Sequence, residues 1–113
     1  MTNEEKQVLR GILTSHKRDV LRSLRDLSGL AIERVPDPIE NTRNKESREE
    51  EAQRIDSLSD QLGEIEVALE KLAEGDFGIC EVCDEEIPMG RMVVNPTARL
   101  CVRDQERKER NNR

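Results

Sequence analysis

The amino-acid sequence predicts a mainly α-helical protein, in which a long antiparallel α-helical coiled coil precedes a small C-terminal finger and a terminal helix. Three observations support this prediction. Leucine, isoleucine and valine recur at helical spacing along two long segments, two prolines separate these segments, and three cysteines gather in the last third of the chain.

The composition favours an elongated helical shape over a compact enzyme. The chain has 113 residues, of which 39% are charged and 34% apolar, whereas a typical globular domain has roughly 25% charged and 45–50% apolar residues. It has no Trp, no Tyr and one Phe, although aromatic side chains supply much of the buried area of small domains. We therefore expect one domain, or one domain with an extended arm, and no deep catalytic pocket.

The charge is unevenly distributed. Thirteen acidic and five basic side chains give residues 36–76 a net charge of −8, whereas residues 1–35 have a net charge of +2 and residues 77–113 none, for a total of −6. Because nucleic-acid-binding proteins are usually basic, this distribution favours a partner with a basic surface, or a bound metal ion.

The chain is expected to be cytoplasmic. No stretch approaches the ~18 apolar residues that a membrane span needs, and the first residues lack the apolar run of a secretory signal. Three cysteines are an odd number, which suits a reducing compartment better than a set of disulfides.

Residues 4–34 are expected to form the first helix. The segment contains no proline, and His16 occupies a position that the apolar series skips, so we expect its imidazole to lie half-buried against the second helix. The apolar residues follow one another at steps of three, four and seven: Leu9, Leu13, Val20, Leu24, Leu27 and Ala31.

A second helix is expected to begin between residues 41 and 48, after Pro36 and Pro38 have ended the first. Its apolar residues step alternately by three and four, the heptad pattern of a coiled coil: Ile55, Leu58, Leu62, Ile65, Leu69 and Leu72. Two helices of about 30 residues that a short turn joins should pair antiparallel and form an arm of roughly 45 Å. An ordinary bundle is the alternative, although the chain has no other long helix to complete one.

The character of the sequence changes after the second helix. Gly75 is the expected C-cap, residues 77–101 are rich in turns, and a short charged helix is expected from about residue 98. The predicted division is a coiled coil over residues 1–74, with its tip at about 35–43, and a finger with the terminal helix over residues 75–113.

The cysteines form a metal-binding pattern. Cys80 and Cys83 form a first pair of ligands three residues apart, which we call the first knuckle. After seventeen residues, Cys101 and Asp104 form the second knuckle with the same spacing. Two pairs of cysteines about 15–20 residues apart are typical of a zinc ribbon. A carboxylate is a harder ligand than a thiolate, so these four residues should bind Zn²⁺ more weakly than four cysteines would. Two alternatives stay open: zinc that is held by the three cysteines plus water, or weakly and exchangeably, and a finger that keeps its shape without metal. His16 is too far along the first helix to be expected as a ligand.

Several strings of the sequence resemble a known family. Residues 75–83 read GDFGICEVC, residues 91–101 read RMVVNPTARLC, and the segment PDPIE, residues 36–40, precedes a glutamate-rich helix. With the coiled coil and the charged terminal helix, these strings resemble the DksA/TraR regulators of bacterial RNA polymerase, over about residues 4–110.

The resemblance implies a transcription regulator that is not an enzyme. Its coiled coil would enter the secondary channel of RNA polymerase with the acidic tip toward the active centre, and would thereby modulate initiation. The finger with its Zn²⁺ and the terminal helix would stay near the channel rim. Sequence-specific DNA binding and membrane binding are not expected, and a stalk for a narrow channel should be monomeric.

The family's tip pattern is Asp-x-x-Asp-x-Ala, and the corresponding residues here are Asp37, Glu40 and Thr42. Glu40 keeps the charge with one more methylene, and Thr42 replaces a small alanine, so the regulatory strength of this tip is open. Apart from the resemblance, Asp37 and Glu40 are also explained as turn residues and N-terminal helix acids.

The resemblance also bears on guanosine tetraphosphate. Members that respond to this alarmone carry basic residues where this chain has Asn95 and Gln105, so we expect a weak or absent response. Arg91 matches an arginine of the family, and its two open roles are a polymerase contact and a salt bridge to the acidic coil.

A different class of function is the alternative: a zinc-ribbon adaptor that binds nucleic acid or another protein through the finger and the basic terminal helix. The lack of aromatic side chains counts against nucleic acid as its partner. A transcript-cleavage factor of the Gre type shares the stalk, but the cysteine cluster argues against it. The basic residues of such an adaptor would be Arg99, Arg103, Arg107, Lys108 and Arg110.

Overall fold

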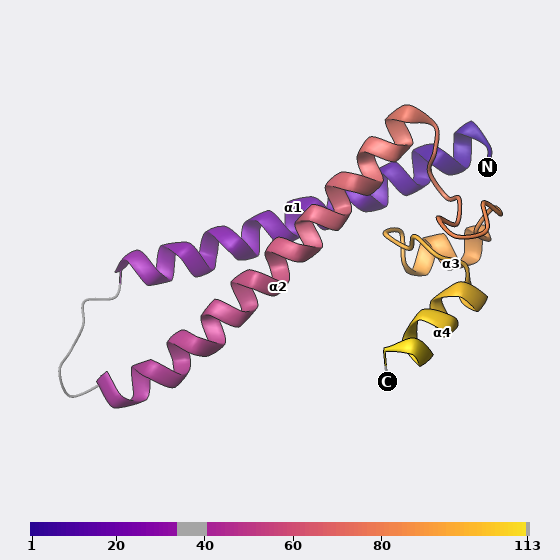
Figure 1. The fold of residues 1–113 in the computed structure, drawn as a ribbon. Coiled ribbons are helices and arrows are strands. Elements are labelled where there is room, and N and C mark those ends of the chain that lie inside the picture. Colours follow the sequence, from indigo (N-terminus) through magenta and orange to yellow (C-terminus); the bar gives the residue numbers. More distant parts are fainter. Residues whose placement is uncertain (34–40, 113) are drawn as a thin grey trace.

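The protein is built on a hairpin of two long helices. A computed structural model describes residues 1–33 and 41–112, and the side chains of residues 1–27 and 47–112. Helix α1 (Asn3–Glu33) and helix α2 (Asn41–Glu74) run antiparallel (Figure 1). The short helices α3 (Met89–Val94) and α4 (Val102–Asn111) belong to the finger, which lies near the hairpin end that carries the N-terminus. The molecule is elongated, with extents of 57 × 35 × 20 Å, and the predicted helical fold class is confirmed.

Local signals set the ends of the two long helices. A capping box begins α1, because Thr2 Oγ1 accepts a hydrogen bond from the Glu5 N–H at 3.1 Å and Glu5 Oε1 accepts one from the Thr2 N–H at 3.0 Å. Gly75 ends α2 with a φ of +93°, a left-handed conformation that glycine adopts without strain. The N–H groups of Gly75 and Asp76 both donate to the Lys71 carbonyl oxygen, as in a helix C-cap.

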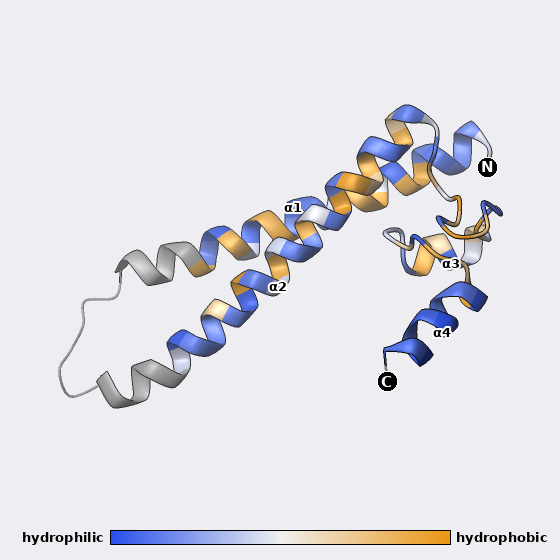
Figure 2. Ribbon diagram, viewed as in Figure 1, coloured by the Kyte–Doolittle hydropathy of each residue, from blue (hydrophilic) through white to orange (hydrophobic). Residues whose placement is uncertain are grey.

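The hairpin is most tightly packed near the finger. Figure 2 shows the apolar residues gathered where the two helices meet, with hydrophilic residues on the outer faces. Farther toward the tip, Leu24, Leu58 and Leu62 are only half-buried. The buried seam is therefore shorter than the heptad pattern, and it consists of Leu9, Leu13 and Val20 of α1 with Ile65, Ala68 and Leu72 of α2.

The finger and the hairpin share one hydrophobic core. Phe77, the single aromatic residue, is 4% exposed and packs in the same cluster as the seam. Other buried members of this cluster come from the finger: Cys80, Ile87, Met92 and Leu100. Because these residues bury their apolar area against the coiled coil as well as against one another, the finger depends on the hairpin for part of its stability.

The expectation for His16 was wrong, because its side chain is exposed rather than half-buried in the seam. Leu13 and Val20 on either side are buried and close the seam without it. An imidazole without a hydrogen-bond partner would lose hydration on burial, so exposure is the lower-energy arrangement.

The terminal helix begins at Val102, four residues later than the sequence suggested. Residues 98–101 belong to the finger instead, because the Arg99 carbonyl oxygen accepts a hydrogen bond from the Glu81 N–H at 2.9 Å. An isolated antiparallel bridge joins Ile79 to Glu86, and the described residues contain no β-strand.

The predicted tip falls largely outside the described residues. Asp37 and Glu40 lie in the segment 34–40 that the structure does not describe, and Thr42 belongs to the first turn of α2. The division into residues 1–74 and 75–113 stays a prediction. Among the described helices, none combines the length and the apolar character that crossing a membrane requires.

Candidate metal centre

The first knuckle is a tight turn that aims two cysteines the same way. The Cys80 N–H donates to the Glu85 carbonyl oxygen at 2.8 Å, and the Asp84 N–H donates back to the Cys80 carbonyl oxygen at 3.0 Å. The turn needs a left-handed residue, and Asp84 supplies it with a φ of 59°, a conformation that aspartate tolerates better than most residues. Cys80 and Cys83 therefore lie on one side of a closed loop.

The second knuckle uses a helix N-terminus to present its two side chains. Cys101 is the N-cap of α4 and has an extended backbone, while Asp104 lies in the first turn of that helix. The Gln105 N–H donates to the Cys101 carbonyl oxygen at 2.9 Å, which begins the helix. Residues three apart across a helix start share a face, so Cys101 and Asp104 meet.

The structure brings all four predicted metal ligands together. One ligand atom from each of Cys80, Cys83, Cys101 and Asp104 lies within 4.8 Å of the others. Asp104 Oδ2 is 3.1 Å from both Cys80 Sγ and Cys101 Sγ, and the Sγ atoms of Cys83 and Cys101 are 3.9 Å apart. Thiolates at about 2.3 Å from a tetrahedral zinc ion are roughly 3.8 Å apart, so this spacing fits such an ion.

The burial of the cluster also fits a metal site. Cys80 is fully buried and Asp104 is 5% exposed, while Cys83 and Cys101 are half-buried. A carboxylate buried to this extent needs partners, and in this cluster they are thiol groups. Three sulfur atoms and one oxygen suit zinc, and four protein ligands form a closed site of the structural rather than the catalytic kind.

The surroundings shift the acidities of the four groups in different directions. Hydrogen bonds from Cys101, Cys80 and Cys83 hold the pKa of Asp104 below its usual value, so its carboxylate is ionised at neutral pH. Burial alone would raise the pKa of Cys80, but backbone N–H groups of Cys83, Cys101 and Val82 lower it overall.

The pKa of Cys83 moves the other way. The Glu85 N–H favours its thiolate, but burial and the neighbouring thiols and Asp104 outweigh this and raise its pKa to about 11. The neighbouring thiols and the carboxylate of Asp104 therefore oppose ionisation of Cys83, and a divalent cation bound by the cluster would favour its thiolate.

The other predicted site residues lie away from this cluster. Arg91 Nε donates to the Leu100 carbonyl oxygen at 3.3 Å, so Arg91 ties α3 to the residue before the second knuckle, and both roles left open for Arg91 stay predictions. Asn95 and Gln105 line a surface hollow of about 740 Å³ between α2, the finger and α4. Asp37 and Glu40 are not described.

Sequence reasoning missed the ion pair between Lys71 of α2 and Glu81 of the first knuckle, in which Nζ and Oε1 are 2.7 Å apart. Ten residues separate the two, and a helix end and a turn lie between them. One indication of this ion pair was present in the sequence, the charged residue Glu81 between two cysteines of the metal cluster. Charged residues are common on protein surfaces, so Glu81 did not stand out.

Comparison with known proteins identifies the fold and the finger. The model of the prokaryotic dksA/traR C4-type zinc finger matches residues 75–110. The solved structure of the transcription factor DksA2 from Pseudomonas aeruginosa has a TM-score of 0.91 and 27% identity, and the match covers 99% of this chain and 88% of that one. The finger's description implies four cysteine ligands, whereas the matched residues of this chain contain three cysteines.

Sequence relatives agree with this match. The RNA polymerase-binding transcription factor DksA of Haemophilus influenzae is 34% identical over 103 residues, which are 87% of this chain and 71% of that protein. The Escherichia coli protein of the same name is 36% identical over 67 residues, and an uncharacterized Aquifex aeolicus protein is 45% identical over 60. The matched regions span only 44% and 41% of those two relatives. With its shared fold and finger, the chain belongs to the DksA/TraR family.

Proposed function

We propose that this protein binds RNA polymerase and modulates transcription initiation, with its coiled coil in the secondary channel of the enzyme. One observation carries the proposal: the whole length of the chain, hairpin and finger together, shares the fold of DksA2. The Haemophilus influenzae relative, whose name states that it binds RNA polymerase, extends the likeness over 103 residues. We expect the protein to act by contact and not as an enzyme.

The shape of the hairpin supports an inserted arm. The end of α1 and the start of α2 lie at the far end of the molecule from the finger (Figure 1). Residues 36–76 have a net charge of −8, and an acidic arm is attracted to a channel that admits nucleotides and has a basic lining. We expect the finger, at the opposite end of the hairpin, to stay at the channel rim.

The tip residues Asp37, Glu40 and Thr42 are our candidates for the regulatory contact. Two carboxylates in the segment between α1 and α2 would act on the catalytic centre electrostatically, and Thr42 is the third residue of the family's tip pattern. We propose Arg91 as a further polymerase contact, because it is only half-buried and its remaining guanidinium N–H groups can reach a partner.

We further propose that Cys80, Cys83, Cys101 and Asp104 hold the Zn²⁺ that the family match and the clustered side chains support. Such an ion would join the two knuckles and fix the finger. A carboxylate in place of the fourth thiolate would make binding weaker and more exchangeable than in a four-cysteine finger.

The charge of the surface hollow bears on whether the protein binds guanosine tetraphosphate. The hollow beside Asn95 and Gln105 is lined by three acidic and three basic side chains, so it has no net charge to attract guanosine tetraphosphate, and we expect at most a weak response. We expect a cytoplasmic monomer that binds neither membranes nor a specific DNA sequence.

The test is a binding and an initiation assay with purified RNA polymerase core enzyme and holoenzyme. The intact protein and an Asp37→Asn, Glu40→Gln variant should bind the core enzyme with similar affinity, and only the intact protein should change open-complex lifetime. Failure of both to bind would overturn the proposal, and equal effects of both on initiation would overturn the role of the tip.

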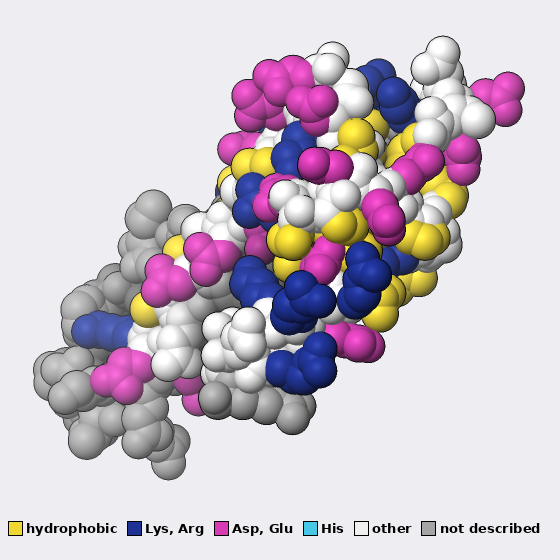
Figure 3. Space-filling view, turned by 45° about the vertical axis from the view of Figure 1, so that its right-hand side comes forward, with side chains coloured by type: hydrophobic (Ala, Val, Ile, Leu, Met, Phe, Trp, Pro, Cys, Tyr) yellow, Lys and Arg dark blue, Asp and Glu magenta, His cyan; other side chains and the backbone are white. Residues whose placement is uncertain are grey.

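The zinc-ribbon adaptor is the second candidate function, and the basic side chains on the surface of α4 favour it. Figure 3 shows basic side chains gathered on one face of the molecule. Helix α4 presents exposed Arg103, Arg107 and Arg110 at helical spacing. DNA binding that weakens as the salt concentration rises, with the slope expected for about three phosphate contacts, would favour a nucleic-acid adaptor. Polymerase binding without DNA binding would exclude DNA as the partner of this surface.

A further inference from the structure

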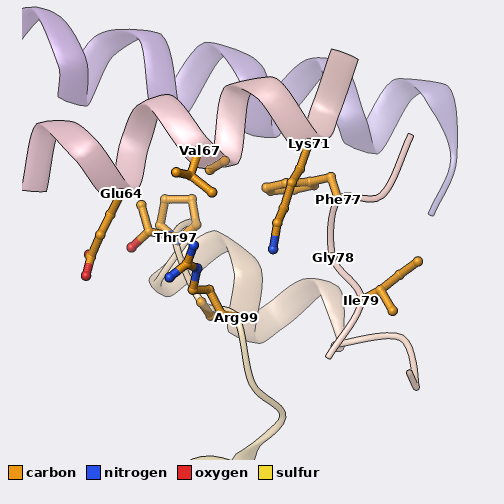
Figure 4. A pocket seen from close by; sticks show the side chains of 11 residues that line it. Glu64, Val67, Lys71, Phe77, Gly78, Ile79, Thr97 and Arg99 are labelled. Carbon is orange, nitrogen blue, oxygen red and sulfur yellow. The ribbon is translucent and has the colours of Figure 1, made fainter. Parts of the chain in front are cut away.

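The carboxylate of Glu81 links the finger to helix α2. Glu81 Oε1 lies 2.7 Å from Lys71 Nζ of α2 and 3.2 Å from Arg99 Nε of the finger. Figure 4 shows Lys71 reaching from α2 toward the finger and Arg99 pointing from the finger toward α2. The hydrogen bond from Lys71 is the main cause of a lowered pKa for Glu81, so this carboxylate is ionised at neutral pH.

Glu81 and Arg99 are also parts of the two metal knuckles. Glu81 directly follows Cys80, and Arg99 precedes Cys101 by two residues. The Glu81 N–H donates to the Arg99 carbonyl oxygen at 2.9 Å, so a backbone hydrogen bond joins the knuckles just beside the cysteines. Any separation of the two knuckles therefore moves the carboxylate that Lys71 binds.

The crevice that Lys71 and Arg99 line beside this ion pair is closely packed. The crevice between α2 and the finger, lined by Val67, Phe77 and Thr97 among others, holds a cavity of only about 10 Å³, at most room for one water molecule. Phe77 and Pro96 are buried there. Since the apolar surfaces fit closely, a small movement of the knuckles disturbs the packing as well as the ion pair.

We infer that Glu81 is a positioning residue, which couples metal binding by the two knuckles to the docking of the finger on α2. The inference rests on the proposed ligands Cys80, Cys83, Cys101 and Asp104. When these side chains share a metal ion, the knuckles stay together and Glu81 stays within reach of Lys71. Coupling between two sites is reciprocal, so Lys71 must in turn strengthen metal binding.

The sign of the effect of Lys71 separates this coupling from simple electrostatics. Lys71 is a cation near a site for a dication, so its charge alone would weaken Zn²⁺ binding, and Lys71→Gln would tighten it. Coupling through docking predicts the opposite, because the variant loses the ion pair that holds the knuckle in place. Exposed pairs contribute modestly, so the expected loss of zinc affinity is roughly two- to fivefold.

The experiment measures Zn²⁺ affinity by chelator competition on the full-length protein. Lys71→Gln and Glu81→Gln should each weaken binding roughly two- to fivefold, and the double variant should lose no more than Glu81→Gln alone. Glu85→Gln is the matched control, because it removes an exposed carboxylate from the same knuckle. It should weaken binding less than Glu81→Gln. At about 1 M NaCl the Debye length falls to about 3 Å, and salt screens the ion pair between Lys71 and Glu81. The loss of zinc affinity caused by Lys71→Gln should therefore be smaller at this salt concentration.

A second measurement follows docking itself. Hydrogen exchange of residues 64–74 should slow when Zn²⁺ is added to the intact protein, and should slow much less in Lys71→Gln. Unchanged or tighter zinc binding by Lys71→Gln, or equal slowing in both proteins, would overturn the coupling. If the intact protein binds no zinc, the proposed metal ligands are wrong and the coupling falls with them. Polymerase binding does not enter either readout.

Discussion

The carboxylate of Asp104 lies 3.1 Å from the thiol of Cys80, although 24 residues separate the two along the chain. The contact closes the metal cluster on its buried side, where Cys80 is fully buried and Asp104 is 5% exposed. Asp104 therefore lies as near to the other members of the cluster as the cysteines do, and replacing Asp104 should have a clear effect on metal binding.

Replacing Asp104 should change zinc affinity in both directions. Asp104→Ala removes one of four ligands and should weaken Zn²⁺ binding by more than about tenfold, since even groups that only orient a ligand contribute roughly 10- to 100-fold. Asp104→Cys should tighten binding, because a thiolate is the softer donor. Competition with a chromophoric chelator gives both values. Equal affinity of all three proteins would show that three cysteines alone bind the metal.

Zinc binding should release protons, and its affinity should fall as the pH falls. Cys83 has a pKa raised to about 11 and is protonated at neutral pH, whereas the pKa of Asp104 is lowered and its carboxylate is already ionised. The protons released therefore come from the cysteines, up to three per zinc ion, and Asp104 contributes none.

Calorimetry in buffers of different ionisation enthalpy counts these protons. Asp104→Cys is the matched comparison and should release up to one proton more than the unaltered protein at the same pH. Proton release that does not rise in this variant, or zinc affinity that is independent of pH between about 6 and 8, would contradict thiolate ligation.

The packing of the hairpin should make its two halves differ in sensitivity to mutation. Leu13 is fully buried near the finger, so Leu13→Ala should lower the free energy of unfolding by about 2–5 kcal/mol. Leu58 is half-buried, and Leu58→Ala should cost less than about half as much. Urea unfolding followed by circular dichroism, at one fixed zinc concentration, measures both. Equal losses would mean that the seam is packed evenly along its length.

The tip substitutions should tune regulation without changing binding. Glu40 is one methylene longer than the aspartate of the family's pattern, and Thr42 is larger than its alanine. Glu40→Asp combined with Thr42→Ala should therefore strengthen the effect on open-complex lifetime severalfold, with unchanged affinity for the core enzyme. Thr42→Ala alone serves as the control for the change in bulk. A weaker effect of the double variant would mean that the longer carboxylate suits this protein's own polymerase.

Local patterns in the sequence were enough to predict the two long helices and the members of the metal cluster, but not the short helix α3 in the segment expected to be rich in turns. Prolines after the first long helix and Gly75 after the second disfavour continuation of the helices through backbone sterics and hydrogen bonding, and the heptad spacing favours a coiled coil. The two knuckles are short turns, so the spacing of Cys80, Cys83, Cys101 and Asp104 already indicated four side chains that could meet.

Contacts between distant segments decided the rest. Burial of the seam depends on where the finger packs, so the exposure of His16 and the half-burial of Leu58 could not be read from spacing. The same is true of the bond between Glu81 and Lys71, which needs α2, its cap and the first knuckle in their final positions. Periodicity and turn chemistry report interactions within a few residues, whereas burial and ion pairing depend on which surfaces the folded chain brings together.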